Sequence, residues 1–433
     1  IGGSIAVLLS FLLRVLTLAQ PLVEAHSFRQ TQTAYTAVIY HRDGIDLLQT
    51  PLPILGPPWV VPIEFPLFQA IAALVMNTGA PTEIALRGTS LAFFVVSVVL
   101  VWQIVRLEMG PRPAAVAVFV YSLAPLGLLW SRTSMVETMA VATSLAAVLE
   151  GVRWDRGGSR RHLFAAVALG SLAALLKITT AAIWLAPAVL LLRRSKLGAV
   201  AVAAVPAFAG IAWTSYTDAI KSHSAATMFL TSGRLTEWNF GTIAQRADPQ
   251  TWLTWLGFVA GLGLLVLAAP IVVRTVRILW WSLLTLILGP LIFTNLYFVH
   301  DYYWMAVGPA AAILSSAVAC RLVLSVPPTW RRTSVLGLIA VFAISFVLYP
   351  RWVVMFRMEP EGQVLMRAAQ IQAATAPEDL VAIDEDSWSP AILFYADRRG
   401  YMEDANVPPA PPGYVRFRCP VPGAIGDCVR ESS

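Results

Sequence analysis

Long apolar runs, separated by short polar segments, dominate this sequence. Eleven runs are long enough, or nearly so, to form a helix that crosses a bilayer, which needs about 20 mostly apolar residues. They cover residues 1–20, 88–105, 113–131, 134–152, 162–176, 178–192, 197–214, 252–273, 278–299, 302–320 and 333–349. The pattern therefore predicts an all-α polytopic membrane protein with about 11 transmembrane helices.

The composition agrees with a membrane protein. Of 433 residues, 57% are hydrophobic and 13% are charged, whereas soluble domains are about 45–50% apolar and about 25% charged. The net charge of +6 does not indicate a nucleic-acid partner, because cytoplasmic loops of membrane proteins collect Lys and Arg.

Charge also predicts the orientation of the chain. A further apolar run, residues 65–76, is short for a span and is more typical of an interfacial or re-entrant helix. When it is left out, the basic loops fall on one side, and the positive-inside rule places the N-terminus in the cytoplasm and the C-terminus outside. These loops carry Arg106/Arg112, Arg153/Arg156/Arg160/Arg161, Arg193/Arg194/Lys196, Arg274/Arg277 and Arg331/Arg332.

The run 162–193 is too long for one straight span. Polar residues in "LLKITTAA" interrupt it at Lys177, Thr179 and Thr180. We therefore expect a tight hairpin with Lys177 at its tip on the outer side.

This topology predicts two exterior loops, residues 21–87 and 215–251, and an exterior tail, residues 350–433. We expect residues 1–349 to form the membrane domain and 350–433 to form a small exterior α/β tail. In the tail, "GQVLMRAAQIQAATA" has helical spacing, "DLVAID" is typical of a buried strand, and "SPAILFYADRRG" is compatible with a helix ending at Gly400.

The cysteines fit the same division. Cys320 lies in an apolar helix and should be inert. Cys419 and Cys428 lie close together in the polar tail, where a disulfide is compatible with an exterior location and a pair of free thiols is the alternative.

Charged and polar residues gather at the outer ends of the predicted spans. Such charges are costly at the edge of a bilayer unless they are paired or functional. One interpretation is interfacial anchoring and helix-packing ion pairs, and the other is a site to which at least five segments contribute. The residues are Glu24, His26, Arg29, Glu64, Arg132, Glu137, Lys177, His300 and Asp301.

The mixture of acids and bases indicates a particular chemistry. Cations, and Arg above all, bind phosphate oxygens, and a nearby carboxylate can take a proton from an attacking hydroxyl. The apolar segment "EFPLFQAIAALVM" suits a substrate with a lipid tail. Together these features favour transfer of a group from a lipid phosphate to an acceptor at the outer membrane surface.

Other chemistries have weaker support. The sequence contains no HExxH, no GxSxG, no Walker motif and no Cys/His cluster with zinc spacing. "DED" at 384–386 has the form of a metal-binding motif, but it follows a predicted strand in the tail, where acidic loop residues are common. We expect no cofactor and no metal.

Several motifs resemble those of a known family. "HSFRQTQTA" (26–34) resembles "H-S-W-R-Q-x-D-T-A", "EFPLFQ" (64–69) resembles "E-F-P-L-Y", and "SRTSMVET" (131–138) is similar to "R-x-x-M-P-E". "LLKITTA" (175–181) resembles "L-x-K-P-T", and "HDYYWMAVGP" (300–309) resembles "H-D-Y-Y-x-x-x-x-x-P". The chain resembles the GT-C superfamily of membrane glycosyltransferases, near the protein mannosyltransferase and aminoarabinose transferase branch.

The resemblance implies a GT-C-like fold and an inverting transferase that uses a polyprenyl-phosphate monosaccharide as donor. Its acceptor would be a glycan, a lipid or a protein, and its site would face the periplasm from the bacterial cytoplasmic membrane. In the family, the first exterior loop supplies a catalytic acid, which places Glu24 first here. Gln32 stands where relatives often carry Asp, and Val136 replaces a Pro, so Glu137 and Glu64 are the alternatives.

The resulting hypothesis assigns a role to each residue. Glu24 is the base, with Glu137 as first alternative, and Arg29 and Lys177 bind the donor phosphate. His300, Asp301 and Tyr302 orient the phosphate or the sugar hydroxyls. Further substrate contacts are assigned to His26, Gln30, Glu64 and Arg132, with Arg14 facing either the phosphate or another helix and with Trp238 and Asn239 near the acceptor.

Two other functions remain compatible with the sequence. A secondary transporter should carry its charges near mid-membrane on broken helices, often with an inverted repeat. A non-catalytic lipid-binding scaffold would keep the cations without needing the acids. The position of Glu24 and Glu137 relative to Arg29 and Lys177 distinguishes these possibilities.

Overall fold

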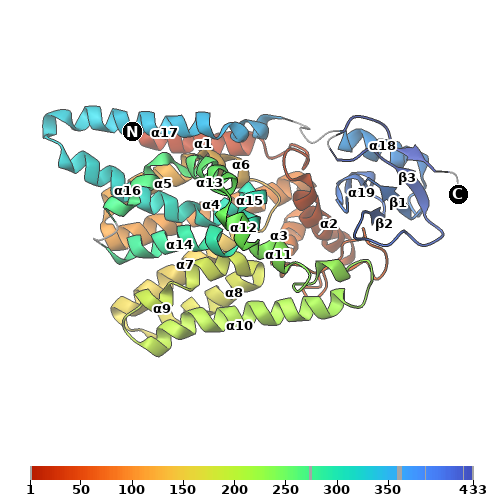
Figure 1. The fold of residues 1–433 in the computed structure, drawn as a ribbon, viewed down its shortest axis with the longest axis horizontal. Coiled ribbons are helices and arrows are strands. Elements are labelled where there is room, and N and C mark those ends of the chain that lie inside the picture. The colour runs from red at the N-terminus through yellow and green to blue at the C-terminus, as the bar shows by residue number, and fades with distance from the viewer. Residues whose placement is uncertain (1, 273–275, 358–362, 386, 423, 432–433) are drawn as a thin grey trace.

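A computed structural model describes residues 2–272, 276–357, 363–385, 387–422 and 424–431. A long helical body has a small sheet at one end, and the C-terminus lies beside that sheet (Figure 1). The protein is therefore mostly helical with a small C-terminal α/β segment, as the sequence predicts.

Each expected span coincides with helical chain. The helices of the body are α1 (Gly2–Leu16), α4 (Thr82–Met109), α5 (Pro111–Leu123), α6 (Pro125–Trp130), α7 (Glu137–Gly157), α8 (Arg160–Leu185), α9 (Ala188–Leu191), α10 (Lys196–Lys221), α13 (Pro249–Leu262), η2 (Leu264–Ile271), α14 (Arg277–Ile292), α15 (Thr294–Val299), η3 (Asp301–Val307), α16 (Gly308–Ser325), η4 (Pro328–Trp330), α17 (Arg331–Leu348) and η5 (Pro350–Phe356).

The expected number of eleven spans is not confirmed. Within the described residues, five helical segments are long and apolar enough to cross a membrane, or six if the pair α13 and η2 counts as one span. Several expected spans are interrupted. Ala124 separates α5 from α6, which begins at Pro125, and Gly263, with a positive φ of 112°, stands at the 97° bend between α13 and η2.

The hairpin predicted at Lys177 is present. Lys177 is the one residue of α8 with a non-helical backbone (φ −162°, ψ 95°). Gly170 lies against Leu185, since a Cβ on Gly170 would meet the Leu185 Cδ1 at 3.0 Å. An unbroken helix would separate these residues by about 22 Å. Residues Arg160–Leu191 form one long apolar segment. This segment therefore turns back at Lys177.

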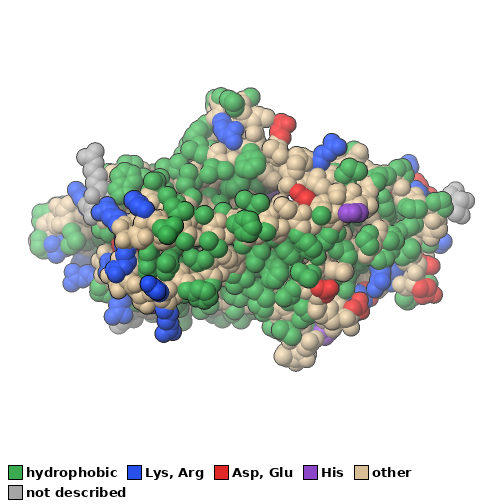
Figure 2. Space-filling model, turned by 90° about the horizontal axis from the view of Figure 1, so that it is seen from below, with side chains coloured by type: hydrophobic (Ala, Val, Ile, Leu, Met, Phe, Trp, Pro, Cys, Tyr) green, Lys and Arg blue, Asp and Glu red, His purple; other side chains and the backbone are tan. Residues whose placement is uncertain are grey.

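The basic segments meet at one end of the body. The backbone N–H groups of Arg193 and Arg194 donate to Asp155 at 2.6 and 2.7 Å, and Arg277 also pairs with Asp155. Figure 2 shows Lys and Arg gathered at this end and a broad apolar surface beyond it. Arg274 lies outside the described residues; for the described basic residues, this segregation is the one that the sequence predicts.

The two exterior loops form the opposite end with the tail. The first loop contains α2 (Ser27–Asp43) and α3 (Leu67–Met76), and the second contains η1 (Met228–Leu230), α11 (Thr236–Phe240) and α12 (Ile243–Ala247). With ten residues, about 15 Å of helix, α3 is too short to span a bilayer. Its interfacial position stays a prediction.

The tail is a four-stranded sheet with two helices. It comprises α18 (Val364–Ala374), β1 (Val381–Asp384), α19 (Ala391–Ala396), β2 (Gly400–Glu403), β3 (Val415–Arg418) and β4 (Val429–Arg430). The strand order is β2-β1-β3-β4; β1 is parallel to β2 and β3, and β3 is antiparallel to β4.

One expectation about the tail is wrong. The helix expected to end at Gly400 ends at Ala396, because Asp397 adopts a left-handed conformation (φ 50°) that stops it. Gly400 instead begins β2, where a Cβ would lie 2.0 Å from the Val381 carbonyl oxygen. Close backbone approach, and not helix termination, requires this glycine.

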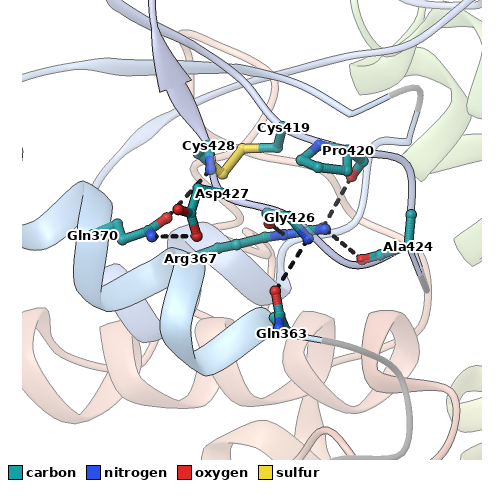
Figure 3. Close-up of a disulfide and its surroundings, with 9 residues drawn as sticks. All are labelled: Gln363, Arg367, Gln370, Cys419, Pro420, Ala424, Gly426, Asp427 and Cys428. Carbon is teal, nitrogen blue, oxygen red and sulfur yellow. Dashed lines mark hydrogen bonds between the residues drawn. A yellow bond between two sulfur atoms is a disulfide. The ribbon is translucent and has the colours of Figure 1, made fainter.

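Cys419 and Cys428 form a disulfide, which decides between the two alternatives that the sequence left open. Arg367 of α18 holds the enclosed loop (Figure 3) by donating to the carbonyls of Pro420, Ala424 and Gly426 at 2.9, 2.7 and 3.1 Å. The disulfide and Arg367 together fix the last strands on α18.

The tail is joined to the first exterior loop. The N–H groups of Gly400 and Met402 donate to the carbonyls of Pro53 and Ile54 at 2.9 and 2.8 Å, so the loop extends the edge of the sheet. The Tyr35 hydroxyl of α2 also donates to the Arg398 carbonyl at 2.6 Å. One apolar core contains residues of both regions, and the tail therefore holds the first exterior loop in place.

Candidate functional site

The sequence-predicted site residues lie at the end formed by the exterior loops, but in two separate groups. One surrounds Glu24, and the other contains Arg29, Lys177 and Glu137. The difference in partners indicates different roles.

Glu24 lies in a buried ion network. Its two carboxylate oxygens accept hydrogen bonds from Arg87 at 2.6 Å and from Arg132 at 2.7 Å, and all three side chains are fully buried. Burial raises the pKa of Glu24, but the two guanidinium groups outweigh it and hold the pKa below its ordinary value. The network connects the loop between α1 and α2 to α4 and to the segment before α7.

Gln30 and Arg132 belong to this network and not to the second group. Gln30 donates to the Ala25 carbonyl at 2.8 Å and accepts from the backbone N–H of Ser134 at 3.2 Å. Arg132 also donates to the Thr17 carbonyl at 3.2 Å. Because their hydrogen bonds connect segments of the protein, they stabilise the fold of the first exterior loop.

The second group centres on Lys177 and Glu137. Glu137 opens α7, and the hairpin brings the Lys177 ammonium into contact with its carboxylate. The Lys177 Nζ lies 4.1 Å from the ring centroid of Tyr303 and 5.4 Å from that of Tyr302. A cation held over aromatic faces keeps its charge in a desolvated place.

Arg29 and Glu64 form a second ion pair beside the first. Arg29 donates to the carboxylate of Glu64 and to the side-chain oxygen of Gln32. Burial lowers the pKa of Arg29, but Glu64 and Glu137 outweigh burial, so the pKa is raised. Two cations and two carboxylates thus share one site, which has no net charge.

Histidines and aromatic rings form the rim. His26, in the left-handed region (φ 46°), approaches Asp301 at 3.3 Å, and its ring is 5.2 Å from that of His300 and 5.0 Å from that of Tyr302. Burial, His26 and Lys177 lower the pKa of His300 to about 3, so His300 is neutral at physiological pH. The ring centroid of Trp238 in α11 lies 6.0 Å from that of His300, and Trp238 is 47% exposed.

Asp301 is held from several sides. The Tyr349 hydroxyl donates to it at 2.5 Å, and Arg351 pairs with it at 3.3 Å. Arg351 is 40% exposed at its side chain, so it presents a cation to solvent beside His26.

Three buried polar atoms of the second group have no hydrogen-bond partner among the described residues. They are Glu137 Oε2, Gln32 Nε2 and His300 Nδ1. Buried polar groups are nearly always paired. Arg87 Nε and Arg132 Nε of the Glu24 network are unpaired as well. What distinguishes the second group is that its unpaired atoms belong to a cluster that also holds the cations Arg29 and Lys177, the combination that suits an anionic ligand.

The remaining candidates lie elsewhere. Arg14 is buried and donates to Ser131 Oγ at 2.6 Å and to the Ser122 carbonyl at 3.0 Å, so it pairs with another helix. For Asn239, the structure shows only a backbone hydrogen bond to Leu235. Asp386 of the "DED" motif lies outside the described residues. No group of three or more His, Cys, Asp or Glu residues suited to a metal occurs among those described.

Sequence reasoning missed Arg87, Arg351 and Tyr349. Arg87 had a usable signal, because it directly precedes the apolar run 88–105, and a cation at the edge of a bilayer is costly unless it is paired or functional. Arg351 follows the last apolar run directly and was indistinguishable from an interfacial anchor. Tyr349 meets Asp301 only through folding, and no local pattern marks it.

The comparisons with known proteins agree with this architecture. Residues 60–213 match the family model described as dolichyl-phosphate-mannose-protein mannosyltransferase. No curated protein sequence matches the chain.

Among solved structures, ArnT from Cupriavidus metallidurans bound to undecaprenyl phosphate is similar. The TM-score is 0.64 at 13% identity, and the match covers 92% of this chain and 85% of ArnT. The archaeal oligosaccharyltransferase AglB from Archaeoglobus fulgidus, in complex with an inhibitory peptide and a dolichol-phosphate, has a TM-score of 0.58 at 12% identity. That match covers 92% of this chain but 63% of AglB.

The fold thus defines a multi-pass membrane protein with an ArnT-like and AglB-like architecture. The resemblance to the GT-C glycosyltransferases, near their protein mannosyltransferase and aminoarabinose transferase branch, is confirmed.

Proposed function

We propose that this protein is an inverting glycosyltransferase that moves a monosaccharide from a polyprenyl-phosphate donor to a hydroxyl acceptor. The single observation that carries the proposal is the site of Arg29, Lys177, Glu64 and Glu137, whose neighbours leave buried polar atoms unpaired. Its fold is that of ArnT, whose structure holds undecaprenyl phosphate.

In this mechanism the acceptor oxygen attacks the anomeric carbon from the face opposite the phosphate. The carbon–oxygen bond to the phosphate breaks, and polyprenyl phosphate leaves with the electron pair. Arg29 and Lys177 stabilise the negative charge that grows on the departing phosphate. Losing one such preorganised donor typically costs about 10²–10³ in rate.

The acceptor proton goes to Glu137 in this proposal. Its Oε2 has no hydrogen-bond partner in the described chain, whereas both oxygens of Glu24 are occupied by arginines. A general base must reach the proton that it removes. The geometry therefore favours Glu137 over Glu24, which remains the alternative base.

The topology belongs to the same proposal. We propose eleven spans, a cytoplasmic basic end, and the site and tail on the periplasmic side of a bacterial cytoplasmic membrane. The tail disulfide supports this orientation, because disulfides persist in oxidising compartments. Residues 1–349 act as the membrane catalytic domain and 350–433 as the periplasmic tail.

Binding of undecaprenyl phosphate to the purified protein tests the cationic half of the site. Arg29→Ala should weaken binding at least tenfold, and Arg29→Lys should restore only part of it, because an ammonium cannot replace a bidentate guanidinium. Arg42→Ala is the matched control, since Arg42 lies on the same helix but pairs with Asp397 at the surface.

Equal binding by the Arg29→Ala and Arg42→Ala proteins would contradict the assignment of Arg29. Loss of lipid binding in Arg29→Ala, together with normal envelope glycosylation in cells whose only copy carries Glu137→Gln or Glu24→Gln, would favour the non-catalytic scaffold.

A further inference from the structure

A lipid-sized cavity lies at the basic end of the molecule, opposite the proposed site. It has a volume of about 950 Å³ and is formed by α1, α5, η2, α16 and α17. That volume lies at the upper end of the range for small-molecule pockets, about 300–1,000 Å³. It is too distant in the fold to belong to the cluster of Arg29 and Lys177.

The walls of this groove are apolar. Val116 and Phe119 of α5 face Val323 of α16 and Ile339 and Phe342 of α17 across it. Both α16 and α17 are among the helices long and apolar enough to span a membrane. Side chains on their surface, such as Ile339 at 49% exposure, would contact lipid. The groove is therefore suited to acyl chains that enter from the bilayer.

Two arginines give the groove a charged end. Arg112, in the first turn of α5, and Arg331, the first residue of α17, both line it and are both exposed. No acidic side chain is among the described residues that line the groove. Each arginine also stands at a helix N-terminus, where the helix dipole adds positive potential.

We propose that this groove binds one anionic glycerophospholipid of the cytoplasmic leaflet. Its phosphate contacts Arg112 and Arg331, and its acyl chains lie between α5, α16 and α17. Anionic lipids are attracted by basic residues at the cytoplasmic surface, and here the two cations adjoin a cavity large enough for chains. The charge selects against zwitterionic lipids of the same chain length.

The sequence led us to expect an inert Cys320, but the structure shows it partly exposed and lining the groove. It therefore provides a reporter there, and the other two cysteines form the disulfide. The full chain in detergent is mixed with phosphatidylglycerol or with phosphatidylcholine of identical chains. The rate at which N-ethylmaleimide alkylates Cys320 is then measured by mass spectrometry. We expect phosphatidylglycerol to slow alkylation at least fivefold and phosphatidylcholine to have little effect.

The double variant Arg112→Gln/Arg331→Gln should lose the protection by phosphatidylglycerol. Arg160→Gln/Arg161→Gln is the matched control. These two arginines are exposed and belong to one of the basic loops, but they do not line the groove. It should keep the protection.

Equal protection by the two lipids, or protection that survives in Arg112→Gln/Arg331→Gln, would overturn the proposal. Protection by undecaprenyl phosphate but not by phosphatidylglycerol would also overturn it, and would assign the groove to the polyprenyl chain. Val323→Trp, which fills the groove, should slow alkylation without added lipid; unchanged alkylation would show that Cys320 reacts from another side.

Discussion

At the scale of single residues, two buried carboxylates differ in what surrounds them. Glu24 is held between two guanidinium groups and has both oxygens hydrogen-bonded. Glu137 has one partner, Lys177, and one buried oxygen without any among the described residues. Both acids are close in sequence to recognisable motifs, so only the three-dimensional contacts separate a structural role from a proposed chemical one.

Glu24→Gln should therefore act mainly on stability. The substitution leaves Arg87 and Arg132 facing one another without a counter-charge, and breaking a buried ion pair costs about 3–5 kcal/mol. Thermal unfolding in detergent should show a clearly lower midpoint than for Asp43→Asn, whose carboxylate is exposed. An unchanged midpoint together with lost transfer would restore Glu24 as the base.

At the scale of elements, the hairpin of α8 depends on close helix packing. Gly170 has no room for a side chain, since a Cβ there would meet Pro206 Cγ at 2.9 Å and Leu185 Cδ1 at 3.0 Å. The two arms of the hairpin, on either side of Lys177 in α8, meet α10 at this glycine. The hairpin tip carries Lys177, so any separation of the arms would also displace the proposed phosphate cation.

Gly170→Leu should destabilise the protein by about 1–3 kcal/mol or more, the usual cost of overpacking. Gly88→Leu is the control, because a Cβ at Gly88 of α4 would meet no atom within 4 Å. Chemical unfolding followed by tryptophan fluorescence compares the two. Similar stabilities for both variants would mean that the arms do not pack as described.

Glu385, beside β1, makes the tail sensitive to pH. Burial raises its pKa to about 8, so the folded tail binds this proton more tightly than the unfolded chain does. The stabilising contribution is present below the ordinary pKa of about 4.5 and is lost as the pH rises through about 8.

Glu385→Gln should remove this dependence. Hydrogen exchange of residues 379–385 should be similar in the two proteins at pH 5. At pH 9 the variant should be about tenfold or more better protected, since about 1.4 kcal/mol corresponds to a factor of ten. Protection that is equal at both pH values would show that Glu385 is not buried as an uncharged acid.

Several elements could be predicted from the sequence because local pattern determines them. The hairpin tip at Lys177, the helix of α18 and the strand β1 each follow from a break or a period. The spacing of Cys419 and Cys428 left a disulfide and two free thiols equally open. The α19 boundary was missed, since the left-handed Asp397 stops the helix before the glycine that looked like its end. Span counting by hydropathy also failed to anticipate the 97° bend at Gly263.

The site was predictable only in part. Sequence indicated that Arg29, Glu64, Glu137 and Lys177 lie at the outer face, and they do meet. It could not show that Arg87 pairs with Glu24, because the two are 63 residues apart and meet only when the loop after α1 folds against α4. Pairings between distant segments are decided by tertiary packing and not by local pattern.

At the scale of the whole molecule, charge is segregated along the long axis. The basic segments occupy one end, and the mixed cluster, the exterior loops and the tail occupy the other (Figures 1 and 2). In a membrane this arrangement would place the proposed site and the lipid groove at opposite surfaces.

Cysteine labelling with a membrane-impermeant reagent in intact cells tests this orientation. With Cys320 replaced by Ala, Ala405→Cys in the tail should be labelled from outside. Gly157→Cys at the basic end should react only after the cells are opened. Labelling of position 157 in intact cells would overturn the orientation and the eleven-span topology.

The central claim, transfer of a sugar by this site, is tested most directly in the cell envelope. Cells that lack the gene are complemented with the wild-type protein, with Glu137→Gln or with the surface control Arg42→Ala, at matched protein levels. Envelope glycans, glycolipids and glycoproteins are then compared by mass spectrometry.

A lost acid–base group typically costs about 10²–10⁴ in rate. We expect a monosaccharide modification that disappears without the gene, returns with the wild type and Arg42→Ala, and stays below a few per cent with Glu137→Gln. Full restoration by Glu137→Gln, or an envelope unchanged by loss of the gene, would contradict the account.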